Sequence, residues 1–158
     1  MCYWLDLFWK WSGISPEEYS SNGMNQNRGQ FEDEFPFFKE LILYAVGVIN
    51  NNVLDELSIE EVLTIMALDN EDEYLLEYIV DNSFDEQFDR IIKLGVVHSQ
   101  FNARWQIAEI IFRRKYTGFK KYLLKLSQDD HPYVRKRALN LMKMANCSTL
   151  ESSPHQEK

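Results

Sequence analysis

The sequence predicts an all-α protein, and three observations support that fold class. Apolar residues recur at helical spacing, as Phe37, Leu41 and Val48 do in the most apolar part of the chain. No segment alternates apolar and polar residues with the period of two that a half-buried strand requires. The 158 residues include only 6 glycines and 4 prolines, so turns are few and helices are favoured. We expect about seven or eight helices in one domain over residues 1–146.

A short aromatic helix is expected over residues 3–11. Its apolar side chains fall on one side, where a lid over the core is the favoured role and docking to a membrane surface or a partner is the alternative. They are Trp4, Leu5, Phe8 and Trp9. Residues 12–33 are polar, carry three glycines and lack an apolar period. We expect this segment to be a long loop, functional or disordered, with disorder favoured.

Helical spacing of apolar residues begins again at Pro36, where a helix is expected because proline suits a first helical turn. Ser58 and Glu61 match the S-x-x-E capping box and are expected to begin a helix that runs through Leu68. Five further helices are expected around apolar sets at helical spacing. The sets are Tyr74, Leu75, Tyr78 and Ile79; Phe84, Phe88, Ile91, Ile92 and Gly95; Trp105, Ala108, Ile111 and Phe112; Phe119, Tyr122, Leu123 and Leu126; and Val134, Ala138, Leu141 and Met142. Residues 147–158 are expected to form a flexible tail.

The sequence carries no recognisable catalytic or metal-binding pattern. None of the motifs GxGxxG, GxxxxGK[ST], GxSxG and HExxH occurs. The histidines His98, His131 and His155 are far apart in the sequence, and none has a cysteine or carboxylate partner at ligand spacing on a helix. We therefore expect a protein that is not an enzyme and that holds neither a metal nor a cofactor.

The chain is expected to be soluble and cytoplasmic, without a membrane partner. Its most apolar window, residues 35–49, is interrupted by Lys39 and Glu40 and is shorter than the roughly 20 apolar residues that cross a bilayer. Cys2 and Cys147 lie near opposite ends and form no disulfide framework, which fits a reducing compartment.

An internal repeat of 31 residues relates two segments of the C-terminal half. Residues 103–108 read ARWQIA, and residues 134–139 read VRKRAL. The longer stretch DDHPYVRKRA, residues 129–138, resembles the second helix of a HEAT repeat, in which an acidic turn, a proline and a V-R-x-x-A core recur. The resemblance is good over residues 117–145, fair over 84–115 and poor before residue 83.

The HEAT resemblance implies an α-solenoid of stacked antiparallel helical hairpins, with residues 84–145 as its best-matching part. In such a stack each hairpin buries the apolar face of its neighbour. The resemblance also implies that Arg104 and Arg135 make structural ion pairs with the carboxylate of a neighbouring turn. Proteins of this class mostly bind other proteins or nucleic acids, although a fold does not fix a function.

Charge is divided unevenly along the chain. Residues 1–89 contain 20 acidic and three basic residues, a formal charge of −17, whereas residues 90–158 contain five acidic and 14 basic residues, a formal charge of +9. The electrostatic field produced by such a charge distribution helps to select binding partners and sets association rates. The division favours a protein that works by binding.

The acidic half offers the sharper candidate site. One run of carboxylates is expected to form a negative ridge that binds a cationic partner, with a merely solubilising surface as the equal alternative. Its residues are Asp69, Glu71, Asp72, Glu73, Glu77, Asp81, Asp85, Glu86 and Asp89. The basic half is expected mainly to neutralise acidic turns of neighbouring helices, and contact with a nucleic-acid backbone is the alternative.

These observations favour a non-enzymatic protein-binding module. Its most specific form is a bacterial immunity or antitoxin protein that covers the active site of a basic, nuclease-type toxin with its acidic face. One alternative is a HEAT-like nucleic-acid-binding protein that uses the basic C-terminal half. Another is a scaffold or chaperone for a second protein.

Overall fold

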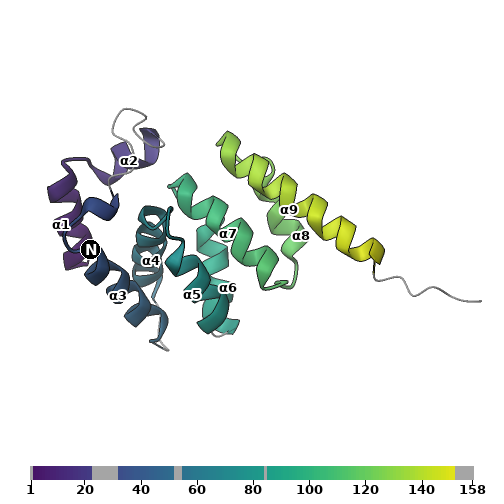
Figure 1. Cartoon of the computed structure of the whole chain (residues 1–158), viewed down its shortest axis with the longest axis horizontal. Helices are drawn as coiled ribbons and strands as arrows, with labels where there is room; N and C mark the ends of the chain where they lie inside the picture. The colour runs from purple at the N-terminus through teal and green to yellow at the C-terminus, as the bar shows by residue number, and fades with distance from the viewer. Residues whose placement is uncertain (1, 23–31, 52–54, 84, 152–158) are drawn as a thin grey trace, which may run out of the picture.

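The computed structural model describes residues 2–22, 32–51, 55–83 and 85–151, with side chains described except at residues 21, 22 and 146–151. Within these ranges the chain forms nine α-helices, one 3-10 helix and no strand, so the predicted all-α class is confirmed (Figure 1). The elements are α1 (Tyr3–Ser12), α2 (Pro16–Asn22), the 3-10 helix η1 (Glu32–Glu34), α3 (Phe38–Ile49), α4 (Glu56–Leu68), α5 (Tyr74–Asn82), α6 (Asp85–Gly95), α7 (Phe101–Arg113), α8 (Phe119–Leu126) and α9 (Pro132–Glu151).

Helix α2 corrects the prediction of a continuous loop over residues 12–33. The side-chain oxygen of Ser15 accepts a hydrogen bond from the Glu18 N–H at 3.1 Å, and the Glu18 carboxylate accepts one from the Ser15 N–H at 2.9 Å. This reciprocal pair is a capping box, and Pro16 occupies the first helical position, where its missing N–H costs nothing. Residues 23–31 lie outside the described part, so the prediction of disorder there stays a prediction.

Helix α4 begins two residues before the predicted capping residue. Asp55 is its N-cap, and the Asp55 carboxylate accepts a hydrogen bond from the Ser58 N–H at 2.7 Å. Glu61 does not return to the helix start, because its carboxylate accepts a hydrogen bond from the Tyr44 hydroxyl at 2.6 Å. The predicted capping box at Ser58 is therefore wrong, and Glu61 instead links α4 to α3.

The N-terminal helix packs as the lid that its aromatic stripe predicts. Leu5, Phe8 and Trp9 are buried on α1. The Phe8 ring meets the Phe35 ring edge-on, with 5.4 Å between centroids, and Trp9 lies 5.7 Å from the Tyr19 ring of α2. These contacts attach α1 and α2 to the rest of the chain.

Helices α4 and α7 form the centre of the molecule. Helix α4 contacts α3, α6 and α7, and α7 also contacts α5, α8 and α9. One cluster of buried apolar side chains runs from α1 to α9, and the helices follow one another along the long axis of the molecule (Figure 1). None of the helices in the described ranges is long and apolar enough to cross a membrane.

Helices α6 and α7 approach each other closely at Gly95. A Cβ atom at this position would lie 2.5 Å from Cγ1 and 2.6 Å from Cδ1 of Ile107, a side chain with no exposed surface. The two helices can approach this closely only because the glycine has no side chain. The buried cluster thus depends on a residue that the sequence marked only as part of an apolar set.

The two arginines of the 31-residue repeat bind the turns that precede their own helices. Arg104 Nη1 donates to the carbonyl oxygens of His98 and Ser99, six and five positions earlier in the chain, at 2.7 and 2.9 Å. Arg135 Nη1 donates in the same way to the carbonyl oxygens of Asp129 and Asp130, at 2.6 and 2.8 Å. The two copies of the sequence repeat therefore make the same pair of hydrogen bonds, from arginine Nη1 to the carbonyl oxygens six and five positions earlier.

Only the first arginine has the ion pair that was predicted for both. Arg104 Nε and Nη2 donate to the two carboxylate oxygens of Asp129, in the following turn, at 2.7 and 2.8 Å. In the part of the chain that the structure describes, no carboxylate pairs with Arg135. The prediction is confirmed for Arg104 and wrong for Arg135.

Candidate partner-binding surface

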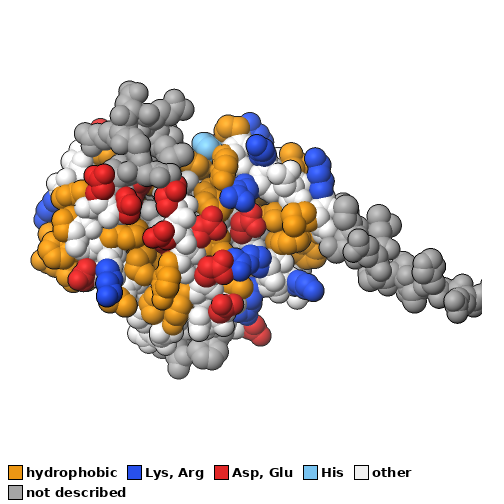
Figure 2. All heavy atoms as spheres, in the orientation of Figure 1, with side chains coloured by type: hydrophobic (Ala, Val, Ile, Leu, Met, Phe, Trp, Pro, Cys, Tyr) orange, Lys and Arg blue, Asp and Glu red, His pale blue; other side chains and the backbone are white. Residues whose placement is uncertain are grey.

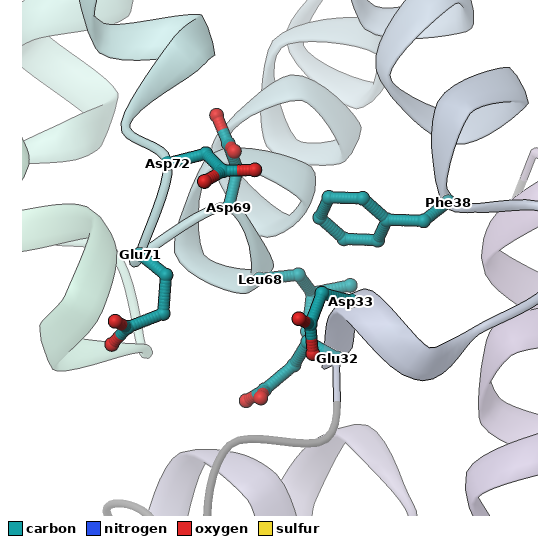
Figure 3. Close-up of a pocket in the computed structure, with 7 residues that line it drawn as sticks. All are labelled: Glu32, Asp33, Phe38, Leu68, Asp69, Glu71 and Asp72. Carbon is teal, nitrogen blue, oxygen red and sulfur yellow. The ribbon is translucent and has the colours of Figure 1, made fainter.

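Two segments far apart in the sequence bring carboxylates together around one small pocket. Glu32 and Asp33 come from η1, and Asp69, Glu71 and Asp72 come from the turn between α4 and α5. Phe38 and Leu68 complete the lining, and the Phe38 ring points toward the α4–α5 turn (Figure 3). The enclosed space of about 30 Å³ exceeds the roughly 10–15 Å³ that one water needs. We call the space lined by these seven residues the acidic pocket.

Asp69 is the buried member of the acidic pocket, with an exposed fraction of 2%. Its Oδ2 atom accepts a hydrogen bond from the Leu75 N–H at 2.7 Å and so satisfies a free donor in the first turn of α5. Its Oδ1 atom has no hydrogen-bond partner among the described residues. One acceptor of this buried carboxylate, itself with almost no exposed surface, thus lacks a donor among the described residues.

Burial makes the Asp69 carboxylate difficult to ionise. Its pKa is raised to about 7, mainly by desolvation and also by the charges of Asp72 and Glu73, although the hydrogen bond from the Leu75 N–H lowers it. Glu73 also adopts the left-handed conformation, with φ +53°, which favours glycine over a residue with a side chain. The Glu73 N–H donates to the Asp69 carbonyl at 3.2 Å and helps hold this turn.

Glu32 is held in place from α2. It is buried, and its carboxylate accepts a hydrogen bond from the Tyr19 hydroxyl at 2.7 Å. Burial and the adjacent charge of Glu32 raise the pKa of Tyr19, which keeps the hydroxyl protonated as the donor. Helix α2 therefore positions a carboxylate of the acidic pocket, although its residues lie in the segment predicted to be a loop.

The structure divides the nine predicted site residues into groups with different surroundings. Asp69, Glu71 and Asp72 line the acidic pocket, and Glu73 follows them in the same turn. Asp81 and Glu86 are exposed beyond it on α5 and α6. The nine residues therefore differ in burial and in their partners, and the predicted ridge stays a prediction.

Three of the predicted site residues bind cations of the C-terminal half. The Glu77 carboxylate accepts two hydrogen bonds from Arg113, both at 2.6 Å. Asp85 pairs with Arg114 at 3.2 Å, and Asp89 pairs with Lys93 and accepts a hydrogen bond from the Tyr116 hydroxyl. Because these charges are neutralised within the molecule, they are poorer candidates for a partner than the pocket carboxylates.

Most arginines of the basic half bind carboxylates within the molecule. The four arginines Arg104, Arg113, Arg114 and Arg137 make ion pairs within the molecule. Figure 2 shows acidic side chains crossing one face of the molecule, with lysine and arginine side chains gathered toward α8 and α9. The predicted internal neutralisation is confirmed for these arginines.

Sequence reasoning found the pocket carboxylates of the α4–α5 turn but missed Glu32 and Asp33. Both were assigned to the polar loop, and nothing in their local sequence predicts that η1 would lie against Leu68. The capping box of Ser15 and Glu18 was the available signal, because it marks the helix that carries Tyr19 to Glu32.

The histidines in the described ranges sit in separate packing contacts. His98 Nε2 lies 3.1 Å from a Glu60 carboxylate oxygen, and the His98 Nδ1 atom accepts a hydrogen bond from the Gln100 N–H. His131 stacks on the Phe101 ring with 3.7 Å between ring centres. No group of three histidine, cysteine or acidic side chains in the described ranges could hold a metal ion. His155 lies outside them.

The fold and this surface define an all-helical protein with an acidic, partly apolar pocket between η1 and the α4–α5 turn. No protein-family model, curated protein or solved structure matches the chain.

Proposed function

We propose that this chain is a non-enzymatic protein-binding module that binds a cationic side chain of a partner protein at the acidic pocket. The observation that supports this most directly is the buried carboxylate of Asp69, whose Oδ1 atom has no hydrogen-bond partner among the described residues. Because Oδ1 has almost no exposed surface, the Asp69 side chain must turn toward the pocket on binding, where a lysine ammonium or arginine guanidinium would supply the missing donor as a charge-assisted hydrogen bond.

The surroundings of Asp69 favour a cation over a neutral group. Asp33, Glu71 and Asp72 also line the pocket, and no cationic side chain is among the described residues that line it. Carboxylates crowded in this way repel one another, and a bound cation relieves that repulsion. Phe38 and Leu68 offer apolar contact to the methylene groups of a lysine or arginine stem.

The helices from α4 to α9 are, in this proposal, HEAT-like hairpins stacked as a solenoid. Support comes from the 31-residue spacing of Arg104 and Arg135, which bind carbonyl oxygens at equivalent positions of two successive turns. The Arg104–Asp129 pair then links one hairpin to the next. Such a stack presents a continuous surface to another protein.

An immunity or antitoxin role in the bacterial cytoplasm is the form of this function that we favour. A nuclease-type toxin carries a basic substrate groove, so an acidic surface would compete with the nucleic acid and accelerate association. A scaffold or chaperone would use the same pocket without protecting a cell. Only the toxin-neutralising form predicts that the partner is toxic when produced alone.

Capture of partners with paired variants tests this proposal. One variant carries Asp33→Asn, Glu71→Gln and Asp72→Asn, and the control carries Glu17→Gln, Asp81→Asn and Glu86→Gln, which remove the same charge from exposed positions elsewhere. We expect a protein from the native cell to bind the wild-type chain and the control but not the pocket variant. Equal capture by both variants would contradict a pocket-centred interface.

A second measurement separates the immunity role from simple binding. The captured protein is produced alone and together with the wild-type chain, and cell survival is counted. Survival that depends on the wild-type chain and is lost with the pocket variant supports neutralisation. A captured protein that is harmless when produced alone would refute the immunity role and leave a scaffold or chaperone.

A further inference from the structure

The second arginine of the 31-residue repeat has the hydrogen bonds of the first but lacks its ion pair. Arg104 Nη1 and Arg135 Nη1 bind carbonyl oxygens at the same two positions of their own turns. Arg104 then directs Nε and Nη2 to the Asp129 carboxylate of the following hairpin. Arg135 holds its guanidinium in the same turn geometry, but within the described ranges no carboxylate meets it.

The Arg104–Asp129 pair shows what such an arginine binds when a hairpin lies beside it. The two side chains keep only 14% and 8% of their exposed area. Burial raises the pKa of Asp129, but the hydrogen bonds from Arg104 and from the His131 N–H outweigh it, so the net shift is downward. A carboxylate at this position is therefore stable as the anion, held by a bidentate pair.

Apolar and basic side chains follow Arg135 along the same side of α9. Leu139 and Lys143 follow Arg135 at intervals of four residues and share its side of α9, away from the buried Val134, Ala138 and Leu141. Leu139 is 45% exposed. This side of α9 thus offers an arginine, a leucine and a lysine to whatever lies against it.

Helix α8 also carries an exposed leucine beside basic side chains. Leu124 is 53% exposed and lies one turn after Lys120 and Lys121, opposite the buried Leu123 and Leu126. No acidic residue occurs in α8, and the first in α9 is Glu151. We call the surface formed by Lys120, Lys121, Leu124, Arg135, Leu139 and Lys143 the α8–α9 outer face.

We propose that the α8–α9 outer face binds a helical hairpin of a partner protein, one whose turn places an aspartate on Arg135 as Asp129 is placed on Arg104. The helices of that hairpin carry apolar side chains for Leu124 and Leu139 and carboxylates for the lysines. This interface rests on the HEAT-like arrangement proposed above, and it is independent of the acidic pocket.

A nucleic acid is the less suitable occupant of this face. Phosphates would satisfy the lysines, but they would leave Leu124 and Leu139 exposed to water. The chain already contains one hairpin in the proposed arrangement, since the turn between α8 and α9 binds Arg104 through Asp129. The Leu123, Leu126 and Val134 side chains of that hairpin are buried. A further hairpin would both pair a carboxylate with the Arg135 guanidinium and cover Leu124 and Leu139.

An extended chain tests the proposed geometry directly. A copy of residues 115–145 is inserted after Ala145, which preserves the 31-residue spacing. We expect a single unfolding transition with a Tm about 3–6 °C above that of the wild-type chain. A separate transition at lower temperature for the added hairpin would overturn the proposal.

Arg135 variants show whether the gain depends on the proposed pair. Arg135→Ala is expected to lower the Tm of the extended chain by about 3 °C more than it lowers the Tm of the wild-type chain. That difference is expected to vanish when the copied Asp129 is replaced by asparagine. Arg135→Lys, which keeps the charge but not the bidentate geometry, should resemble the alanine variant; equal losses in both chains would refute the pairing.

Crosslinking in the native cell tests the occupant itself. A photoreactive residue at Leu139 is compared with one at Leu57 on α4, which is 78% exposed. We expect an adduct at position 139 only, on a helical segment beside an acidic turn. An adduct to nucleic acid or to a basic segment, or no adduct above the Leu57 control, would overturn the proposal. The pocket variant should give the same adduct, so the two proposals can fail separately.

Discussion

At the scale of single residues, Asp69 combines a structural and a binding role in one side chain. One carboxylate oxygen accepts a hydrogen bond from the Leu75 N–H and fixes the start of α5, while the other is buried without a partner among the described residues. A buried aspartate of this kind costs stability when it is charged. The sequence predicted an acidic residue on a surface ridge, whereas the structure makes it an ionisable group inside the molecule.

Stability should therefore fall with rising pH because of Asp69. The folded-state pKa of about 7 lies above the ordinary value of 3.8, so the folded form binds the proton more tightly than the unfolded form does. The stabilising contribution is complete below about pH 4 and is lost as the pH rises through about 7. Asp69→Asn removes this dependence while its side-chain oxygen still accepts the Leu75 N–H.

Urea unfolding at pH 5 and pH 8 measures this effect. Relative to the wild-type chain, we expect Asp69→Asn to gain about 1–3 kcal/mol in free energy of unfolding between the two pH values. Asp81→Asn, at an exposed position, serves as the control and should show no such gain. An equal difference between variant and wild type at both pH values would exclude a raised pKa for Asp69.

At the scale of elements, the sequence predicted eight of the nine described helices and missed α2 for a physical reason. Helical spacing needs several apolar positions to be visible, and α2 is only seven residues long, with Tyr19 as its one large apolar side chain. Its start is encoded instead by Ser15, Pro16 and Glu18. Capping residues therefore mark an element that periodicity does not reveal.

The candidate site was predictable only as far as it is local in sequence. Asp69, Glu71 and Asp72 occupy one turn, so their neighbourhood follows from the chain. Glu32 and Asp33 reach them through tertiary packing, with Tyr19 donating to Glu32 from α2. No periodic pattern encodes that convergence, because it depends on how three separate elements pack.

Loss of the α2 cap should weaken both the helix and the pocket. Ser15→Ala leaves the Glu18 N–H without its side-chain acceptor and is expected to cost about 1 kcal/mol in free energy of unfolding. Fluorescence should report the same change, since Trp9 lies 5.7 Å from Tyr19. Glu17→Ala, at an exposed position of the same turn, is the control. If both variants lose equal stability, the capping box is not what supports α2.

Contact between α6 and α7 at Gly95 gives a second prediction at this scale. Gly95→Ala forces a Cβ atom against the buried Ile107 and is expected to cost about 1–3 kcal/mol. Gly47→Ala in α3, where an added Cβ meets nothing within 4 Å, should instead gain about 0.5–1 kcal/mol. Thermal unfolding compares the two.

A paired substitution checks that the loss comes from this contact. With Ile107→Ala, which removes both Cγ1 and Cδ1, the cost of Gly95→Ala should become smaller, so the two effects should not add. Strictly additive losses would mean that the helices separate at this point without strain.

At the scale of the whole molecule, the division of charge along the sequence is partly cancelled by folding. Arg113 reaches back to Glu77 and Arg114 to Asp85, so cations of the second half neutralise carboxylates of the first. Outside these pairs lie two clusters of like charge, the carboxylates of the acidic pocket at η1 and the α4–α5 turn and the exposed lysines on α8 and α9. The two proposed interfaces use these two remaining charge clusters.

The crowded carboxylates of the acidic pocket should make the stability of the chain sensitive to salt. The formal net charge of −8 adds to the repulsion inside the pocket, and 1 M salt shortens the screening length to about 3 Å. We expect the Tm of the wild-type chain to rise between 20 mM and 1 M sodium chloride, at about pH 8. The variant with Asp33→Asn, Glu71→Gln and Asp72→Asn should start about 1–3 °C higher in low salt and rise less.

The control with Glu17→Gln, Asp81→Asn and Glu86→Gln separates local crowding from overall charge. It changes the net charge by the same amount but leaves the pocket carboxylates in place. If repulsion is concentrated at the pocket, this control should keep most of the salt response of the wild-type chain, since exposed and well-separated charges are already screened by water. Identical salt responses in the two variants would show that net charge alone sets the effect, and the acidic pocket would then have no stored repulsion for a cationic partner to relieve.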